Sequence, residues 1–116
     1  SATFTVTASP GERLQFETMF VQSNDWFYAF GGGGLALFNG DTPVSGDVTA
    51  QVVLYDAGTE EDTAPGTGPN QKPAQDPVAM NVGPADDNLA VRLASTSGFT
   101  IPATASVIRV TVTPQP

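Results

Sequence analysis

Residues 13–22 read RLQFETMFVQ, and apolar and polar side chains alternate along this stretch. One predicted face carries Leu14, Phe16, Thr18 and Phe20. A period of two is typical of a half-buried strand, because successive side chains of a strand point to opposite faces of the sheet. The stretch therefore predicts a β-strand with one face in a hydrophobic core.

The same alternation recurs along the rest of the chain. Further strands are expected at residues 2–8, 26–30, 35–38, 48–55, 89–94 and 106–113. No segment places apolar residues at helical spacing, and clusters of Gly, Pro, Asn and Asp separate the expected strands. The sequence predicts an all-β fold in one domain over residues 1–116, an antiparallel β-sandwich of about seven to eight strands.

Two features follow the expected strand at 26–30. Its aromatic residues, Trp26, Phe27, Tyr28 and Phe30, suit either a core or a carbohydrate-stacking surface, and their alternation in a strand favours the core. The run GGGG at 31–34 lacks the Lys and the helix start of a phosphate-binding loop. We interpret it as a flexible hairpin turn.

Charge and composition limit the function. Twelve acidic residues against four basic ones give a net charge of −8, which disfavours nucleic-acid binding. No run approaches the roughly 20 apolar residues of a membrane span. With no Cys and no His, thiolate and imidazole metal sites are excluded, and so is the usual base of a serine nucleophile. A non-catalytic protein is expected, in which the carboxylates serve solubility or bind a hard cation such as Ca²⁺.

The candidate metal ligands are Asp25, Asp56 and Glu60. Asp25 precedes the aromatic strand, while Asp56 ends the strand at 48–55 and opens the turn DAGTEED. Gly58 permits a tight bend that directs both carboxylates of the turn to one point. The loop at 56–88 is acidic and rich in Pro and Gly, and loops of this length are usually functional or disordered. A solvated acidic loop is the alternative to a calcium site here.

Two stretches resemble the spondin N-terminal domain family. They are SNDWFYAF at 23–30 and LYDAGTEEDTAPGTGPNQKP at 54–73, which are similar to that family's S-P-D-W-F/I motif and to its D-A-G-T-D motif with a following P-N. The run PGERLQFETMFVQ at 10–22 also looks like the strand that enters this region in bacterial members. The resemblance covers only the later part of the family domain.

The resemblance implies a C2-like β-sandwich that binds calcium at one end of its sheets, in secreted or cell-surface proteins of adhesion and matrix contacts. It assigns the metal to Asp25, Asp56 and Glu60. Asn24 stands where the motif has proline, which is expected to matter little. Glu60 stands where the motif has aspartate, and its longer side chain could shift ligation to Glu61 or Asp62.

We therefore expect a calcium-binding extracellular module whose partner is a protein or a surface glycan. The alternative is a structural subunit of a calcium-stabilised polymer or filament. In that case copies would associate through edge strands, and residues 1–8 would be the donor strand.

Overall fold

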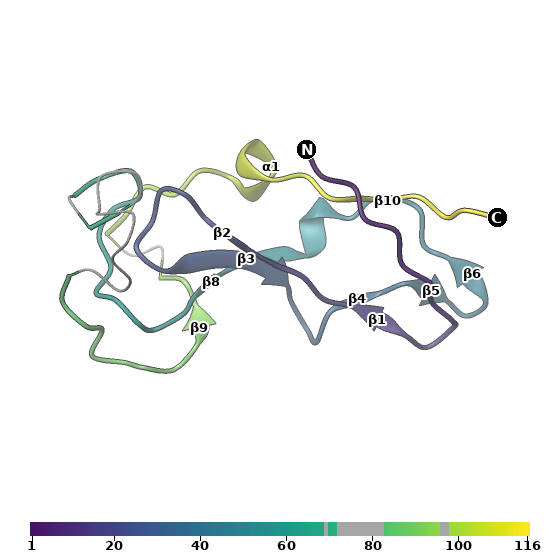
Figure 1. Ribbon diagram of the computed structural model, residues 1–116, viewed down its shortest axis with the longest axis horizontal. Coiled ribbons are helices and arrows are strands. Elements are labelled where there is room, and N and C mark those ends of the chain that lie inside the picture. The colour runs from purple at the N-terminus through teal and green to yellow at the C-terminus, as the bar shows by residue number, and fades with distance from the viewer. Residues whose placement is uncertain (69, 72–82, 96–97) are drawn as a thin grey trace.

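The computed structural model describes residues 1–68, 70–71, 83–95 and 98–116. Within these ranges ten short strands form four antiparallel sheets. The molecule is elongated, with extents of 48 × 26 × 25 Å (Figure 1). The chain is therefore all-β, as the alternation predicts, while the two-layer sandwich stays a prediction.

The four-stranded central sheet has the order β2-β3-β8-β9, and the other strands form the pairs β1–β4, β5–β6 and β7–β10. In chain order the elements are β1 (Arg13–Leu14), β2 (Glu17–Met19), β3 (Trp26–Phe30), β4 (Leu35–Ala36), β5 (Phe38–Asn39), β6 (Thr42–Pro43), β7 (Gly46–Asp47), η1 (Thr49–Gln51), β8 (Val52–Asp56), β9 (Arg92–Leu93), α1 (Thr104–Val107) and β10 (Thr111–Val112). Among the described residues, none forms a helix that is long and apolar enough to cross a membrane.

β3 and β8 are the two inner strands of the central sheet. Their antiparallel register runs from Trp26 opposite Asp56 to Phe30 opposite Val52. Aromatic and β-branched side chains fill both strands, and such residues pack well across a pleated sheet. The register fixes which residues meet at each end of the pair.

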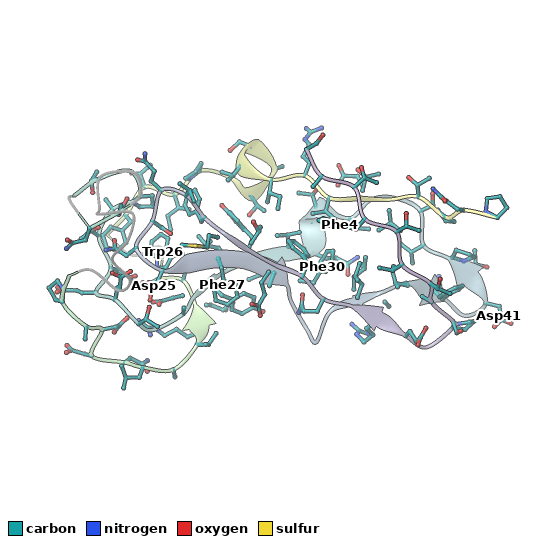
Figure 2. All side chains as sticks on the ribbon, in the orientation of Figure 1. Phe4, Asp25, Trp26, Phe27, Phe30 and Asp41 are labelled. Carbon is teal, nitrogen blue, oxygen red and sulfur yellow. The ribbon has the colours of Figure 1, made fainter. Side chains whose placement is uncertain are left out.

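One face of β3 makes the core. Trp26, Tyr28 and Phe30 are each 1% exposed, so these three confirm the core interpretation of the aromatic strand. Figure 2 labels Trp26 and Phe30 at the two ends of this strand. Phe16 packs edge-on against Phe30, with ring centroids 4.8 Å apart. Phe27 points to the other face of the sheet, where it is only half-buried and stacks on Tyr55. Burying each large apolar side chain stabilises the fold by about 1.5–3 kcal/mol.

The strand expected at 13–22 is broken into β1 and β2. The side chain of Gln15 explains the break, because its Nε2 donates to the Phe30 carbonyl and its Oε1 accepts from the Phe30 N–H, at 2.8 and 2.9 Å. A side-chain amide thus takes the position of a main-chain partner. The ladder resumes only at Glu17, opposite Ala29.

The other strand boundaries also differ from expectation. Residues 2–8 form no strand, and the stretches at 35–38, 48–55, 89–94 and 106–113 contain shorter strands, η1 or the end of α1. β6 and β7 were not expected, because Pro43 and Gly46 are poor strand formers; Pro43 is tolerated in a sheet of only two strands. The loop at 56–88 contains no strand beyond Asp56 in its described part, and residues 69 and 72–82 lie outside the description.

The turn at 31–34 is confirmed, but its interpretation as a hairpin is wrong. β3 and β4, which flank it, pair with other strands. The Gly34 N–H donates to the Gly31 carbonyl at 3.2 Å, and Arg13 Nη2 donates to the Gly34 carbonyl at 2.5 Å. The turn therefore transfers the chain from the central sheet to the β1–β4 pair.

We expect Gly34→Ala to destabilise the fold far more than Gly33→Ala. Both glycines have positive φ, but a Cβ on Gly34 would lie 2.7 Å from the Leu14 carbonyl oxygen, whereas one on Gly33 meets nothing within 4 Å. The control substitution should cost about 1 kcal/mol for its backbone conformation, and Gly34→Ala at least about twice that, because β1 must move. Urea unfolding of both variants measures the difference, and equal midpoints would contradict the close approach.

Candidate metal centre

Two of the expected ligands lie at the same end of the central sheet. Asp25 directly precedes β3, and Asp56 is the last residue of β8. They come together because Trp26 pairs with Asp56 in the antiparallel ladder. The Ala57 N–H extends this pairing by donating to the Asp25 carbonyl at 3.1 Å. Figure 2 shows Asp25 beside Trp26 at this end of the molecule.

The turn after β8 is folded around the Asp25 side chain. Asp25 Oδ2 accepts hydrogen bonds from the Thr59 N–H at 2.6 Å, the Thr59 hydroxyl at 3.0 Å and the Glu60 N–H at 3.0 Å. One carboxylate oxygen thus satisfies three donors of a turn that lies more than thirty residues away in sequence. This leaves Oδ1 of Asp25 free for another role.

The two carboxylate oxygens of Asp56 also have different surroundings. Its side chain is fully buried, and its Oδ1 accepts from the Gly58 N–H at 2.7 Å, a local turn that aspartate commonly forms. Gly58 has a φ of 72°, and a Cβ there would lie 2.8 Å from the Asn88 carbonyl oxygen. The bend that the sequence indicated at Gly58 therefore requires glycine, because any other residue would place a Cβ against the backbone near Asn88.

Asp62 is the third carboxylate of the cluster. Its Oδ1 accepts a hydrogen bond of 2.7 Å from Trp26 Nε1, so the buried indole holds it against the sheet. One carboxylate oxygen from each of Asp25, Asp56 and Asp62 lies within 4.8 Å of the others. Oxygens that bind one calcium ion at about 2.4 Å are at most about 4.8 Å apart. The spacing therefore fits a shared hard cation.

Three buried oxygens near this cluster have no hydrogen-bond partner among the described residues. They are Asp25 Oδ1, Asp56 Oδ2 and Glu60 Oε1. Leaving a buried acceptor unsatisfied costs about 1–3 kcal/mol, and more for a charged group. Asp25 uses one oxygen to hold the turn and presents the other, unbonded, to the cluster. Asp56 also uses one oxygen for the turn, but its Oδ2 is ion-paired with Arg92 Nη2 at 2.6 Å. This is the arrangement that a metal ion would complete.

The structure brings Asp25 and Asp56 together with Asp62 rather than with Glu60. Glu60 is only 4% exposed, and its backbone binds Asp25, but it is not one of the three carboxylates that gather within 4.8 Å. The position of Asp62 is compatible with the shift of ligation to Asp62 or Glu61 that the resemblance implied, and that shift stays a prediction. Glu60 as a ligand stays a prediction, supported by its unbonded Oε1.

The carboxylates of the cluster destabilise one another's charges. Burial raises the pKa of Asp62 to about 6, and the negative charge of Asp56 adds to this effect. Burial also raises the pKa of Glu60 above its ordinary value, with a contribution from Asp25. Groups that are costly to ionise together gain most from a cation that neutralises them.

Arg92 supplies a positive charge at the cluster. Its Nη2 lies 2.6 Å from Asp56 Oδ2 and 2.5 Å from Asp86 Oδ2. The ladder that pairs Asp56 with Arg92 in β9 brings the two side chains together. Sequence reasoning missed Arg92, because nothing near it in the chain indicates that β9 is the neighbour of β8.

A second network attaches the following loop to the same end of the sheet. Gln71 is 2% exposed, and its Nε2 donates to Asn24 Oδ1, Thr63 Oγ1 and the Ala64 carbonyl at 3.1, 2.7 and 2.9 Å. Thr63 Oγ1 also donates to Asn24 Oδ1 at 2.7 Å. Asn24 therefore has a structural role that the resemblance, in which its position carries proline, did not indicate.

No family model, no curated protein and no solved structure matches this chain. The resemblance to the spondin N-terminal domain rests on the two motifs alone and stays a prediction. The candidate metal centre rests on the positions of the Asp25, Asp56 and Asp62 carboxylates.

In the absence of metal, the protein should lose stability as the pH rises from about 4 to about 6. The folded state holds the Asp62 proton up to a pKa of about 6, against 3.8 ordinarily, so in this window the native state binds more protons than the unfolded one. Asp62→Asn should remove most of this decline and stabilise the metal-free protein at neutral pH. Urea midpoints in EDTA across this range measure the effect.

The matched control is Asp41→Asn, which removes one charge from an exposed position between β5 and β6. This variant should keep the pH dependence of the parent. A decline that persists unchanged in Asp62→Asn would show that Asp62 is not the group responsible.

Proposed function

We propose that this chain is a secreted calcium-binding module that makes adhesive or matrix contacts, and that its ion is structural. The observation that carries the calcium part is the cluster of Asp25, Asp56 and Asp62 carboxylate oxygens within 4.8 Å of one another, with the buried Asp25 Oδ1 and Glu60 Oε1 left without a hydrogen-bond partner among the described residues. The proposed role is non-catalytic, since the chain has no His or Cys and the clustered aspartates are engaged in holding the fold.

A cation explains the cluster better than hydrogen bonding within the protein does. Asp25 and Asp56 already accept every N–H donor that the turn at 57–60 directs at them, at 2.6 to 3.0 Å. The remaining Asp25 oxygen is buried without a partner in the described part of the chain, and the remaining Asp56 oxygen has Arg92 alone as its cation among the described residues. Buried carboxylates are costly to keep ionised unless their charge is compensated. Arg92 pairs with Asp56 and neutralises only part of the negative charge of the three aspartates.

Calcium suits this set of donors better than other metals. All candidate ligands are oxygens, and calcium accepts six to eight of them in flexible geometry at about 2.3–2.6 Å. Magnesium needs near-ideal octahedral geometry and keeps its waters, which suits a buried cluster less well. Thiolate and imidazole, which soft and borderline metals prefer, are absent from the sequence.

The bound ion would join three segments that are distant in sequence. Asp25 precedes β3, Asp56 ends β8, and Asp62 lies in the loop that Gln71 attaches to Asn24. Ligation of all three would fix this loop against the central sheet and remove the repulsion within the cluster. We expect the ordered loop to present the surface that a protein or a surface glycan recognises. The extracellular setting and the adhesive role follow from the motif resemblance.

Calcium should raise the melting temperature of the wild-type protein. An ion that binds only the folded state adds about 2.7 kcal/mol at a hundredfold excess over its Kd, or roughly 10 °C for a domain of this size. Asp56→Asn should abolish this gain, while Asp41→Asn, at the opposite end of the molecule (Figure 2), should keep it. Asp41 is a cleaner control than Asp86, which shares Arg92 with Asp56. Calorimetry in EDTA and in calcium makes the comparison, and equal gains in both variants would overturn the proposed site.

Terbium should bind at this site and emit when tryptophan is excited. The chain has one Trp, and Trp26 Nε1 lies 2.7 Å from Asp62 Oδ1, so an ion held by Asp62 lies close enough to the indole for energy transfer. We expect sensitised emission that excess calcium quenches. Asp62→Ala should lose it and Asp41→Asn should not. Emission that is absent, or that survives in Asp62→Ala, would place the ion elsewhere.

A further inference from the structure

Residues 1–8 are an extended segment without a hydrogen-bond partner in the described structure, although residues 6–8 lie beside Leu14 and Leu37. They belong to no strand, and they neither donate nor accept a hydrogen bond within the part of the chain that the structure describes. Phe4 is 85% exposed and Val6 56% exposed, while threonines occupy the alternate positions. An extended segment with one apolar side and open backbone groups is suited to joining the edge of a sheet.

The distribution of charge singles out the same segment. All twelve acidic residues lie between Glu12 and Asp87, so residues 1–11 and 88–116 contain none. Two copies of a chain with a net charge of −8 repel each other wherever their acidic parts approach. They can meet at short range only where carboxylates are missing, which makes the acid-free segments the favoured meeting points.

The β9 edge of the central sheet provides an acceptor for such a strand. β9 is the last strand of the sheet. Leu93 in β9 is 64% exposed, and Leu89 and Val91, at alternate positions of the chain just before β9, are 75% and 64% exposed. Because the Ala94 N–H points to the Leu54 carbonyl of β8, the Leu93 N–H points to the outer edge. The opposite edge, β2, carries Glu17, and a charge on an edge strand protects it from pairing.

The exposed area is consistent with two such contacts for each chain. The accessible surface is 7528 Å², against about 6,000 Å² for a compact monomer of 12.0 kDa. The chain therefore exposes more surface than a compact monomer of this mass, and a standard interface takes about 800 Å² of it on each partner. One copy would bury one interface as donor and a second as acceptor.

We propose that residues 2–8 of one copy add as a strand to the β9 edge of a second copy. The apolar side chains of Phe4 and Val6 would then pack beside Val91 and Leu93 of the acceptor. Figure 1 shows the donor segment running toward β5 and β6, whereas β9 lies toward the other end of the molecule. Donor and acceptor are therefore different surfaces, and a head-to-tail contact of this kind builds an open chain of copies unless its rotation closes a ring.

The test uses two variants of the full chain, each defective in one surface. Phe4→Lys with Val6→Lys removes the donor, and Val91→Lys with Leu93→Lys removes the acceptor. All four side chains are at least 56% exposed, so the variants should fold, which their melting temperatures check. The matched control is Thr3→Lys with Thr5→Lys, which adds the same charge to the polar side of the donor.

Light scattering coupled to size exclusion, in calcium at high micromolar concentration, should find assemblies of several copies for the wild type and for the threonine control. Each defective variant alone should be a monomer. An equimolar mixture of the two defective variants should form a dimer of one copy of each, because one retains the donor and the other the acceptor.

A monomeric wild type would overturn the proposal. So would a donor-defective variant that still assembles, a threonine control that dissociates, or a mixture that stays monomeric. The readout is mass and not calcium-dependent stability. The proposed calcium site and this interface can therefore fail separately.

Discussion

The antiparallel pairing of β3 with β8 is the constraint on which the rest of the structure depends. It places Trp26 opposite Asp56, and this one register decides both what is buried and what gathers at the end of the sheet. A shift of one residue would turn Trp26, Tyr28 and Phe30 out of the core. It would also separate Asp56 from Asp25. Core packing and the acidic cluster are thus set by the same set of backbone hydrogen bonds.

The acidic cluster opposes the stability that this pairing provides. Asp56 is fully buried and Asp25 nearly so, and Asp62 is costly to ionise in their company. The fold tolerates this arrangement because one oxygen each of Asp25 and Asp56 accepts hydrogen bonds from the turn even without a metal. One oxygen of Asp25 organises the turn at 59–60, and one of Asp56 sets the bend at Gly58. In each of the two aspartates, one oxygen therefore holds the turn while the other faces the acidic cluster.

Local sequence patterns predicted the fold class and part of the site. The alternation at 13–22 and the aromatic run at 26–30 indicated strands, because period-two patterning is a local property. Asp25 and Asp56 were predicted from their positions at the ends of strands. The bridging of Gln15 to Phe30, the contact of Trp26 with Asp62 and the pairing of Asp56 with Arg92 were not. Each depends on which distant segments lie side by side, and no local period encodes that.

Arg92 has a consequence for ion selectivity. Its guanidinium lies against Asp56 and has a second anion in Asp86, so it can withdraw from Asp56 without becoming unpaired. A monovalent ion entering the cluster would only exchange one positive charge for another beside Asp56, with no net electrostatic gain. A divalent ion brings twice the charge and can displace the guanidinium. In the proposed calcium site, Arg92 would therefore compete with the ion for Asp56, so that the charge of the ion and not its size would decide between calcium and sodium or potassium.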